Sequence, residues 1–177
     1  MKFLPTILSL SRIAAAPFVW RSITSRDWDT AVPLCILFGL TDLLDGQLAR
    51  RFGWTSRFGA WSDAIGDKVL LGTVYIALAV AGRAPAWLVG LVFGRDVFIL
   101  LMAAIGLLFT RIRDFPPSLW GKLSTNVQIA TALVLLLDAA LARPWFIGLC
   151  TVTTVLSGLH YFYSGILRLR AIASKAD

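Results

Sequence analysis

The sequence contains no glutamate and a single histidine, and charged residues make up only 15% of its 177 positions. Hydrophobic residues make up 58%, and the mean hydropathy is +0.76. A soluble domain of this length carries more charge, because its surface must face water. The composition therefore indicates a membrane protein and argues against a water-soluble enzyme.

Cysteines and cleavage signals are also scarce. The two cysteines, Cys35 and Cys150, lie inside apolar runs, so they fit small core residues rather than a disulfide framework or a zinc site. The first apolar run follows Lys2 closely, as in a secretory leader, but neither a small-residue cleavage site nor a polar mature domain follows it. We therefore expect no cleaved leader and no separate soluble domain.

Apolar runs of about 20 residues, the length that crosses a bilayer, recur along the whole chain. The predicted spans are 7–24, 30–50, 60–82, 86–110, 121–141 and 145–168. Ahead of the first span, the segment KFLPTILSL predicts a short juxtamembrane helix that is broken near Pro5. We predict an all-α polytopic membrane protein with six transmembrane helices, forming a single domain over residues 1–177.

The basic residues, which give a net charge of +7, lie between the apolar runs. They fit membrane topology and attraction to anionic lipid head groups, and we predict no nucleic-acid partner. One side carries Lys2, Arg12, Arg50, Arg51, Arg57, Lys68, Arg111, Arg113, Lys122, Arg168, Arg170 and Lys175, and the other Arg21, Arg26, Arg83 and Arg143. Basic flanks stay in the cytoplasm, so both termini are predicted there. The compact chain without a transit peptide favours a bacterial inner membrane.

Four aspartates, Asp42, Asp45, Asp63 and Asp67, lie near the ends of two consecutive predicted spans. The first pair is spaced by three residues and the second by four, so each pair projects from one face of its helix. A short segment links the pairs, and the two helix ends are therefore neighbours. Four carboxylates in so small a volume beside lipid are costly unless a cation binds them.

A site made only of carboxylates selects a hard divalent cation, preferably Mg²⁺, with Mn²⁺ or Ca²⁺ as alternatives. Four acids can hold one ion or a bridged pair. Helix capping or solvation explains a single aspartate near a helix end. It does not explain four aspartates with paired helical spacings, so metal binding is our interpretation.

Small residues and an arginine stand in register with the aspartates. Gly46 and Ala49 follow on the face of the first pair, and Gly59 lies one turn before the second pair. They leave room for a ligand, and Arg50 can face a phosphate. Close helix packing is the usual reason for small residues in membrane helices, and it is sufficient for Gly66. Metal, arginine and cleft together predict a diphosphate substrate.

These positions resemble the signature of a known family. Asp-x-x-Asp-Gly-x-x-Ala-Arg over 42–50, then eight residues, Gly59, three residues, Asp63, three residues and Asp67, is similar to the full signature of the CDP-alcohol phosphotransferases. The opening segment LPTILSLSRIAAAPF also resembles theirs, with Thr6 where many relatives have Asn. The resemblance covers the whole chain and implies six membrane helices, an N-terminal juxtamembrane helix and a homodimer.

The resemblance also implies a reaction and a role for each residue. Family members transfer a phosphatidyl or related group from a CDP-linked donor to an alcohol and release CMP. The implied metal ligands, for two Mg²⁺ or Mn²⁺ ions, are Asp42, Asp45, Asp63 and Asp67, and Asp67 is also the implied general base. The implied nucleotide and diphosphate contacts are Asp42, Gly46, Ala49, Arg50 and Gly59.

The sequence is less specific about the acceptor alcohol than about the donor site. The chain resembles both cardiolipin synthases that use CDP-diacylglycerol and phosphatidylglycerophosphate synthases. The segment GRDVFILL (94–101) is similar to the Arg-Asp segment of the former, so phosphatidylglycerol is our first acceptor and glycerol-3-phosphate the alternative. Lys122, Thr125 and Gln128 resemble both groups. The residues expected to bind the acceptor are Arg95, Arg111, Arg113, Lys122 and Arg168.

Polar residues inside the later spans have more than one interpretation. Arg95 and Asp96 form either part of the acceptor site or a structural pair with a neighbouring helix. His160 is expected to form a buried interhelical hydrogen bond, with an acceptor contact as the alternative. Asp138 is expected at the far-side end of the fifth span.

Two classes of protein without enzymatic activity are the alternatives to a transferase. A divalent-cation transporter needs polar residues through the full membrane depth, whereas the ionisable groups here gather on the cytoplasmic side. A structural membrane protein needs no carboxylate register. The prediction is therefore a phospholipid-synthesising transferase whose active site faces the cytoplasm.

Overall fold

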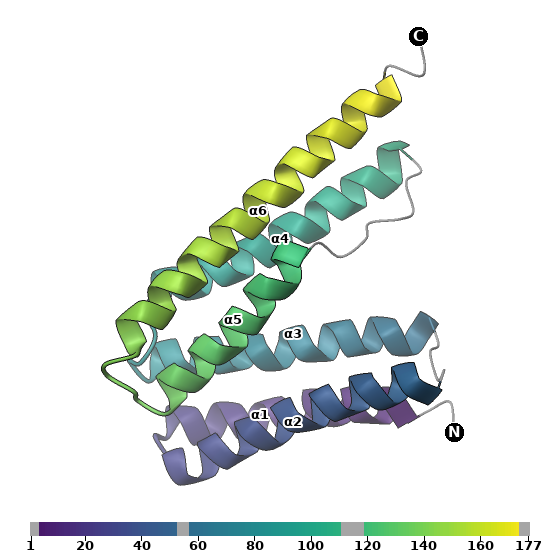
Figure 1. Cartoon of the computed structure of the whole chain (residues 1–177). Helices are drawn as coiled ribbons and strands as arrows, with labels where there is room; N and C mark the ends of the chain where they lie inside the picture. The colour runs from purple at the N-terminus through teal and green to yellow at the C-terminus, as the bar shows by residue number, and fades with distance from the viewer. Residues whose placement is uncertain (1–3, 53–56, 111–118, 174–177) are drawn as a thin grey trace. The chain divides into compact units, whose positions relative to one another are not determined.

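The computed structural model describes the backbone of residues 4–52, 57–110 and 119–173, and the side chains of residues 11–41, 66, 68–102 and 119–167. Every regular element in these residues is a helix (Figure 1). The helices are α1 (Leu4–Thr24), α2 (Trp28–Phe52), α3 (Arg57–Val80), α4 (Ala86–Thr110), α5 (Leu119–Leu136) and α6 (Arg143–Ala173). The all-α prediction is thus confirmed for the described part of the chain.

The predicted spans correspond one to one to these helices, with boundaries shifted by a few residues. The fifth span was predicted to reach residue 141, whereas α5 ends at Leu136. The predicted break near Pro5 is wrong, and no separate helix precedes α1 in the described residues, because α1 runs unbroken from Leu4. Proline is tolerated in the first turn of a helix, since the N–H that it lacks would have no partner there.

Three helices end in the same way. The residues Arg26, Gly82 and Asp138, which follow α1, α3 and α5, adopt left-handed conformations with φ of 58°, 80° and 54°. After Gly82, the amide of Arg83 donates to the Leu78 carbonyl at 2.8 Å, as in a Schellman motif. Equivalent bonds close the other two helices. These turns satisfy the last carbonyls of each helix and let the next helix begin within a few residues.

The chain divides into two compact units, which are described separately. They are Met1–Pro85 with Leu135–Asp138, and Ala86–Val134 with Ala139–Asp177. In the first unit, α1 packs against both α3 and α2. Figure 1 shows that α1 and α3 run in the same direction and α2 runs in the opposite one. Val19 and Ile23 of α1 are fully buried, as are Tyr75 and Leu78 of α3, so an apolar core holds these helices together.

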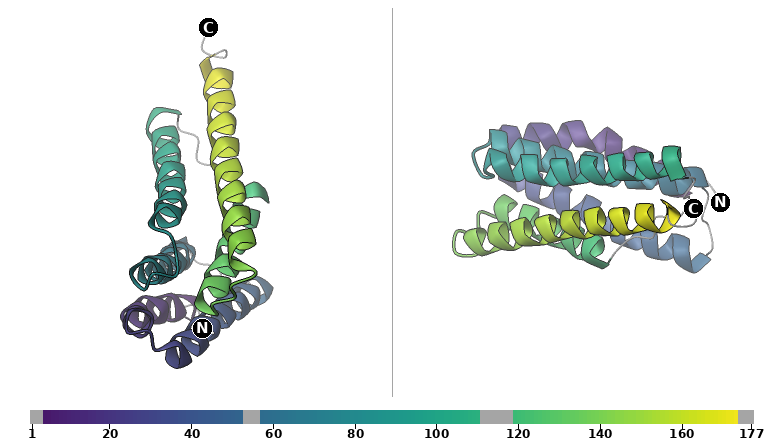
Figure 2. Two further views of the ribbon diagram at one scale, coloured as in Figure 1. Left: turned by 90° about the vertical axis from the view of Figure 1, so that its left-hand side faces the viewer. Right: turned by 90° about the horizontal axis from the view of Figure 1, so that it is seen from above.

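In the second unit, α4 and α6 pack as a parallel pair (Figure 2). Arg95 contacts Ser157, and farther along both helices a Cβ added at Gly165 would lie 3.0 Å from Cε of Met102. Residue numbers therefore rise together along the two helices. The close approach at Gly165 is typical of membrane helices, in which small residues let neighbours come near.

The helices α5 and α6 form an antiparallel hairpin in the same unit. Gln128 bonds to Thr154, and Thr131 bonds to the carbonyl of Phe146, so the residue numbers change in opposite directions. All of these side chains come from the polar minority of two apolar helices. Hydrogen bonds of this kind join helices where apolar contact alone gives no preference over lipid.

Large apolar side chains are exposed on many of the described helices. The exposed fraction is 69% for Phe18 and 62% for Leu100. In the part of the chain that the structure describes, Arg143–Leu167 is long and apolar enough to cross a membrane, with a mean hydropathy of 1.3. Trp28–Thr41 and Lys68–Val80 are shorter apolar helices. Such surfaces are unfavourable in water, which fits a membrane-associated protein.

Candidate active site

The predicted carboxylates lie on two consecutive helices of the first unit. Asp42 and Asp45 belong to α2, and Asp63 and Asp67 to α3, while their side chains lie outside the described residues. Both helices are continuous through these positions, so each pair stays on one helix face. The end of α2 and the start of α3 lie at the same end of the unit (Figure 1). This arrangement is compatible with one shared site, which stays a prediction.

The predicted nucleotide and diphosphate contacts lie on the same two helices. Gly46, Ala49 and Arg50 are near the end of α2, and Gly59 is in the first turn of α3, again with side chains outside the described set. A cation near the end of a helix also interacts favourably with the helix dipole. These residues thus lie within a few positions of the aspartates on the same two helices.

Buried glycines accompany the aspartates on α3. Gly66, which stands between Asp63 and Asp67 in the sequence, is buried, and so is Gly72 one and a half turns on. The neighbouring α1 packs along α3 in this unit. The burial of both glycines fits close helix packing, which stays the interpretation of Gly66.

Arg12 of α1 is a buried cation that the sequence analysis assigned to a cytoplasmic flank. Only 2% of the residue is exposed. Arg12 stands about as far from the end of α1 at Thr24 as Asp67 stands from the end of α3 at Val80, and the two helices pack in parallel. A buried guanidinium needs anionic or carbonyl partners. A lone arginine inside an apolar run is the signal that could have added Arg12 to the candidate site.

The donor chemistry of the candidate site fits a hard divalent cation. Four carboxylates supply only oxygen ligands, which Mg²⁺ and Mn²⁺ prefer. Among the side chains that the structure describes, no group of three or more His, Cys, Asp or Glu could hold a metal ion. The aspartates on α2 and α3 therefore remain the predicted metal ligands.

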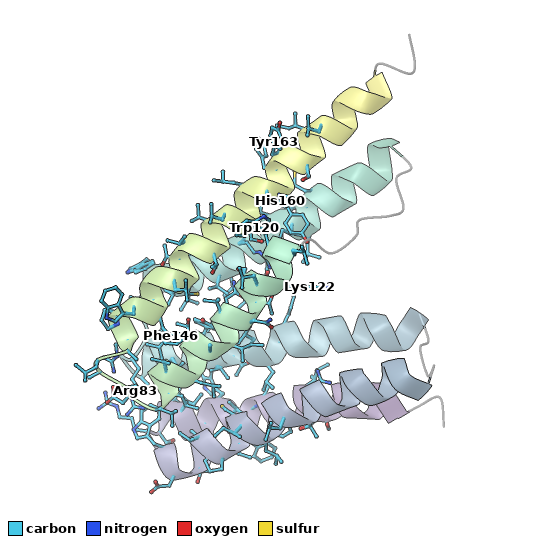
Figure 3. All side chains as sticks on the ribbon, in the orientation of Figure 1. Arg83, Trp120, Lys122, Phe146, His160 and Tyr163 are labelled. Carbon is cyan, nitrogen blue, oxygen red and sulfur yellow. The ribbon has the colours of Figure 1, made fainter. Side chains whose placement is uncertain are left out.

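The predicted acceptor-binding residues differ in what the structure says of them. Arg111 and Arg113 lie outside the described residues, and so does the side chain of Arg168, whose backbone continues α6. Lys122 lies in the first turn of α5 and is exposed (Figure 3). Arg95, in contrast, is only 8% exposed through its side chain. The two described cations thus have opposite environments.

Arg95 forms an ion pair and hydrogen bonds that involve three helices. Its Nη1 lies 2.7 Å from Oδ1 of Asp96, the next residue of α4. Its Nη2 and Nε donate to Oγ of Ser157 on α6 at 2.8 and 3.3 Å, and Nη2 also donates to the carbonyl of Gly121 on α5 at 3.5 Å. The structural contact with neighbouring helices, one of the two predicted alternatives, is therefore present.

Thr125 and Gln128, two of the positions at which the chain resembles both groups of synthases, make structural contacts. Gln128 is 1% exposed, and its Nε2 donates to Oγ1 of Thr154 at 3.2 Å and to Oγ of Ser124 at 3.4 Å. Thr125 donates to the carbonyl of Gly121 at 3.1 Å. Buried amides require such partners. Gln128 therefore joins α5 to α6 in this structure.

The prediction of a buried His160 is wrong. The residue is exposed on α6 (Figure 3). Its ring packs edge-on against Tyr161 of the same helix, with 6.3 Å between centroids. Tyr163 is likewise 65% exposed. Apolar residues occur on every face of α6, so its sequence pattern did not indicate which face packs inside the unit.

Arg83 makes a group of contacts at the end of the first unit that lies opposite the start of α3. The guanidinium of Arg83 stacks 3.4 Å from the centroid of the Trp28 ring, bonds to the carbonyl of Leu136 and lies 3.5 Å from Oδ2 of Asp138. These contacts tie the start of α2 and the turn after α3 to the end of α5. Asp138 follows the end of α5, while its place on the far side of a membrane stays a prediction.

Apolar helices with exposed hydrophobic surface, and aspartate pairs on two consecutive helices, are features of a helical membrane-associated protein. The chain belongs to the CDP-alcohol phosphatidyltransferase family, whose model matches residues 2–159. The resemblance predicted from the aspartate signature is thereby confirmed.

The relatives are named for two different activities. A Drosophila melanogaster protein named probable cardiolipin synthase (CMP-forming) is 36% identical, covering 87% of this chain and 56% of the relative. The cardiolipin synthase (CMP-forming) of Rattus norvegicus is 31% identical, covering 97% and 64%. A Mycobacterium tuberculosis protein named probable phosphatidylglycerophosphate synthase is 33% identical, covering 85% and 70%. The chain thus spans 56–70% of the length of these relatives.

Proposed function

We propose that the protein transfers a phosphatidyl group from CDP-diacylglycerol to the hydroxyl of phosphatidylglycerol, giving cardiolipin and CMP. The observation that carries this proposal is the complete aspartate signature on two continuous helices of a family member. Glycerol-3-phosphate is the alternative acceptor, because relatives of both kinds show similar identity to the chain.

In this proposal the residues of α2 and α3 divide the work of donor binding and proton transfer. The metal ligands are Asp42, Asp45, Asp63 and Asp67, and the nucleotide and diphosphate contacts are Asp42, Gly46, Ala49, Arg50 and Gly59. Bound divalent ions would neutralise the charge of the diphosphate oxygens. Arg50 adds a fixed cation on the protein side, and the glycines leave space for the nucleotide.

The transfer step requires a base at the acceptor hydroxyl. The hydroxyl oxygen forms a bond to the phosphorus that carries diacylglycerol, and the bond from that phosphorus to the CMP oxygen breaks. The electron pair leaves with CMP, and the acceptor proton passes to the carboxylate of Asp67. A carboxylate can serve as the base when it lies within hydrogen-bonding range of a hydroxyl that is held in line for attack.

The proposed setting is a membrane crossed by all six helices, with the aspartates at its cytoplasmic face and two chains in a homodimer. Both lipid substrates then keep their acyl chains in the bilayer while the nucleotide stays at the water boundary. The cations proposed for the acceptor's phosphate are Lys122, Arg111, Arg113 and Arg168.

The test compares acceptors with purified protein in vesicles that contain CDP-diacylglycerol and Mg²⁺. CMP release is measured with phosphatidylglycerol or with glycerol-3-phosphate, and the lipid products are identified by mass spectrometry. We expect cardiolipin with phosphatidylglycerol and no turnover after chelation of divalent ions. Efficient use of glycerol-3-phosphate without use of phosphatidylglycerol selects the alternative acceptor, and no CMP release with either acceptor contradicts the proposed function.

A further inference from the structure

The buried arginine of α4 has its hydrogen-bonding groups engaged inside the protein. All three guanidinium nitrogens of Arg95 bond to protein atoms, on Asp96, Ser157 and Gly121. Arginine recognises a phosphate best through a fork of adjacent N–H groups. To offer that fork, Arg95 would first have to break contacts with two neighbouring helices.

We propose that Arg95 is a positioning residue that fixes the first turn of α5 and thereby holds Lys122 in place for the acceptor. The inference rests on the proposed function, since Lys122 is an acceptor-binding residue only there. It differs from the direct acceptor contact that the sequence suggested for Arg95.

The contact with α5 falls directly beside Lys122. The Gly121 carbonyl accepts hydrogen bonds from Nη2 of Arg95 and from Oγ1 of Thr125. Gly121 is buried and Lys122 is exposed. Of these adjacent residues, the glycine therefore lies on the side of Arg95 and the lysine on the surface. A glycine at 121 brings no side chain between its carbonyl and the guanidinium. The arginine therefore holds the backbone of the turn that presents the ammonium group.

The remainder of α5 is held by other contacts. Gln128 bonds to Thr154, and Thr131 bonds to the carbonyl of Phe146 at 3.2 Å. These bonds lie two and three turns beyond Gly121. Loss of the Arg95 contacts is therefore expected to loosen the start of α5 while the α5–α6 hairpin persists.

Asp96 makes the buried position tolerable for a cation. Its carboxylate lies 2.7 Å from Arg95, and its side chain is 17% exposed. Removing one member of a buried ion pair leaves the other charge uncompensated, which is strongly destabilising. Arg95→Lys is therefore the better test, because it keeps the charge but cannot reach Asp96, Ser157 and Gly121 with one planar fork.

The first arm of the test needs no turnover. Amide hydrogen exchange is measured on the full chain in lipid vesicles, comparing residues 123–126, whose amides bond back into the first turn of α5, with residues 129–134. Arg95→Lys is expected to accelerate exchange in the first set by about tenfold and leave the second unchanged. The matched variant Thr131→Val removes a bond of the same hairpin and should leave residues 123–126 unchanged.

The second arm measures kinetics with phosphatidylglycerol vesicles and, separately, glycerol-3-phosphate. Arg95→Lys is expected to raise the KM for whichever acceptor is used by about tenfold, with kcat and the KM for CDP-diacylglycerol within about twofold. Unchanged exchange at 123–126 overturns the proposal. A fall in kcat with an unchanged acceptor KM also overturns it, because Arg95 would then act on the reacting groups. If the wild-type protein releases no CMP, the proposed function fails. The exchange measurement still tests whether Arg95 fixes the first turn of α5.

Discussion

The aspartate segment of α2 and α3 and the polar contacts between α5 and α6 are two ways of placing polar groups in an apolar chain. The aspartates are close in sequence, and their spacing alone indicates a shared face and a ligand. The seam between α5 and α6, formed by Ser124, Gln128, Thr131 and Thr154, draws on residues that are distant in sequence. Its partners become visible only when the helices are packed.

The difference concerns the chemistry that each region can perform. Hydroxyl and amide groups in the seam are buried, and they form hydrogen bonds with one another or with backbone carbonyls. Clustered carboxylates cannot do so, because like charges need a cation. Seam residues should therefore affect stability, and aspartate residues should affect turnover. The following variants test that division.

Asp67→Asn is expected to give the largest effect, a loss of turnover of about 10³-fold, because the amide cannot accept the acceptor proton. Binding of CDP-diacylglycerol and the thermal stability should be largely retained. CMP release and donor binding are measured on the same preparation. Asp138→Asn is the matched control, since it changes an aspartate at the far end of the first unit and should keep turnover. Wild-type turnover by Asp67→Asn would rule out the general-base role.

Gln128→Leu should lower the free energy of unfolding by about 0.6–2 kcal/mol, the range for interhelical hydrogen bonds in membranes. The leucine removes the donor to Thr154 while keeping the apolar bulk. Unfolding in mild detergent is compared with that of Asn126→Leu, which changes an exposed polar residue of the same helix. Turnover per folded molecule should be unchanged in both. An inactive Gln128→Leu protein of normal stability would place Gln128 in the active site instead.

Arg83→Gln should have the smallest effect, a loss of about 0.5–1 kcal/mol of stability, the size of an exposed cation–π contact. It removes the stacking on Trp28 and the ion pair with Asp138. Thermal unfolding and CMP release are compared with those of Arg21→Gln, an exposed arginine. Loss of turnover without loss of stability would show that the far end of the first unit takes part in the reaction.

The sequence predicts the helices well because each apolar run is long and bounded by Pro, Gly or charge. Pro5 was misleading because a proline breaks a helix interior but not a first turn. The placement of His160 failed for another reason, since the face of α6 that packs against α4 depends on contacts such as Arg95 with Ser157. Local pattern thus determined the elements, and long-range packing determined their faces.

The candidate site follows the same division. The aspartates, Gly46, Ala49, Arg50 and Gly59 could be grouped from spacing, because they lie on helices joined by a short link. Spacing alone does not group Arg12 with them, because it lies on α1 and comes beside α2 and α3 only when the helices pack. Arg95 was singled out as a charge inside a predicted span, and it lies within α4. Its bonds to α5 and α6 could only be seen in the folded unit.

The length of α6 has a consequence for where its final cations stand. A helix of 31 residues measures about 46 Å at 1.5 Å per residue, whereas a bilayer's hydrocarbon core is about 30 Å thick. If Arg143 marks one boundary of the core, the backbone crosses the other boundary about five residues before Arg168. In the proposed membrane setting, and with α6 along the membrane normal, the helix would act as a rigid spacer that carries Arg168 and Arg170 into the head-group layer.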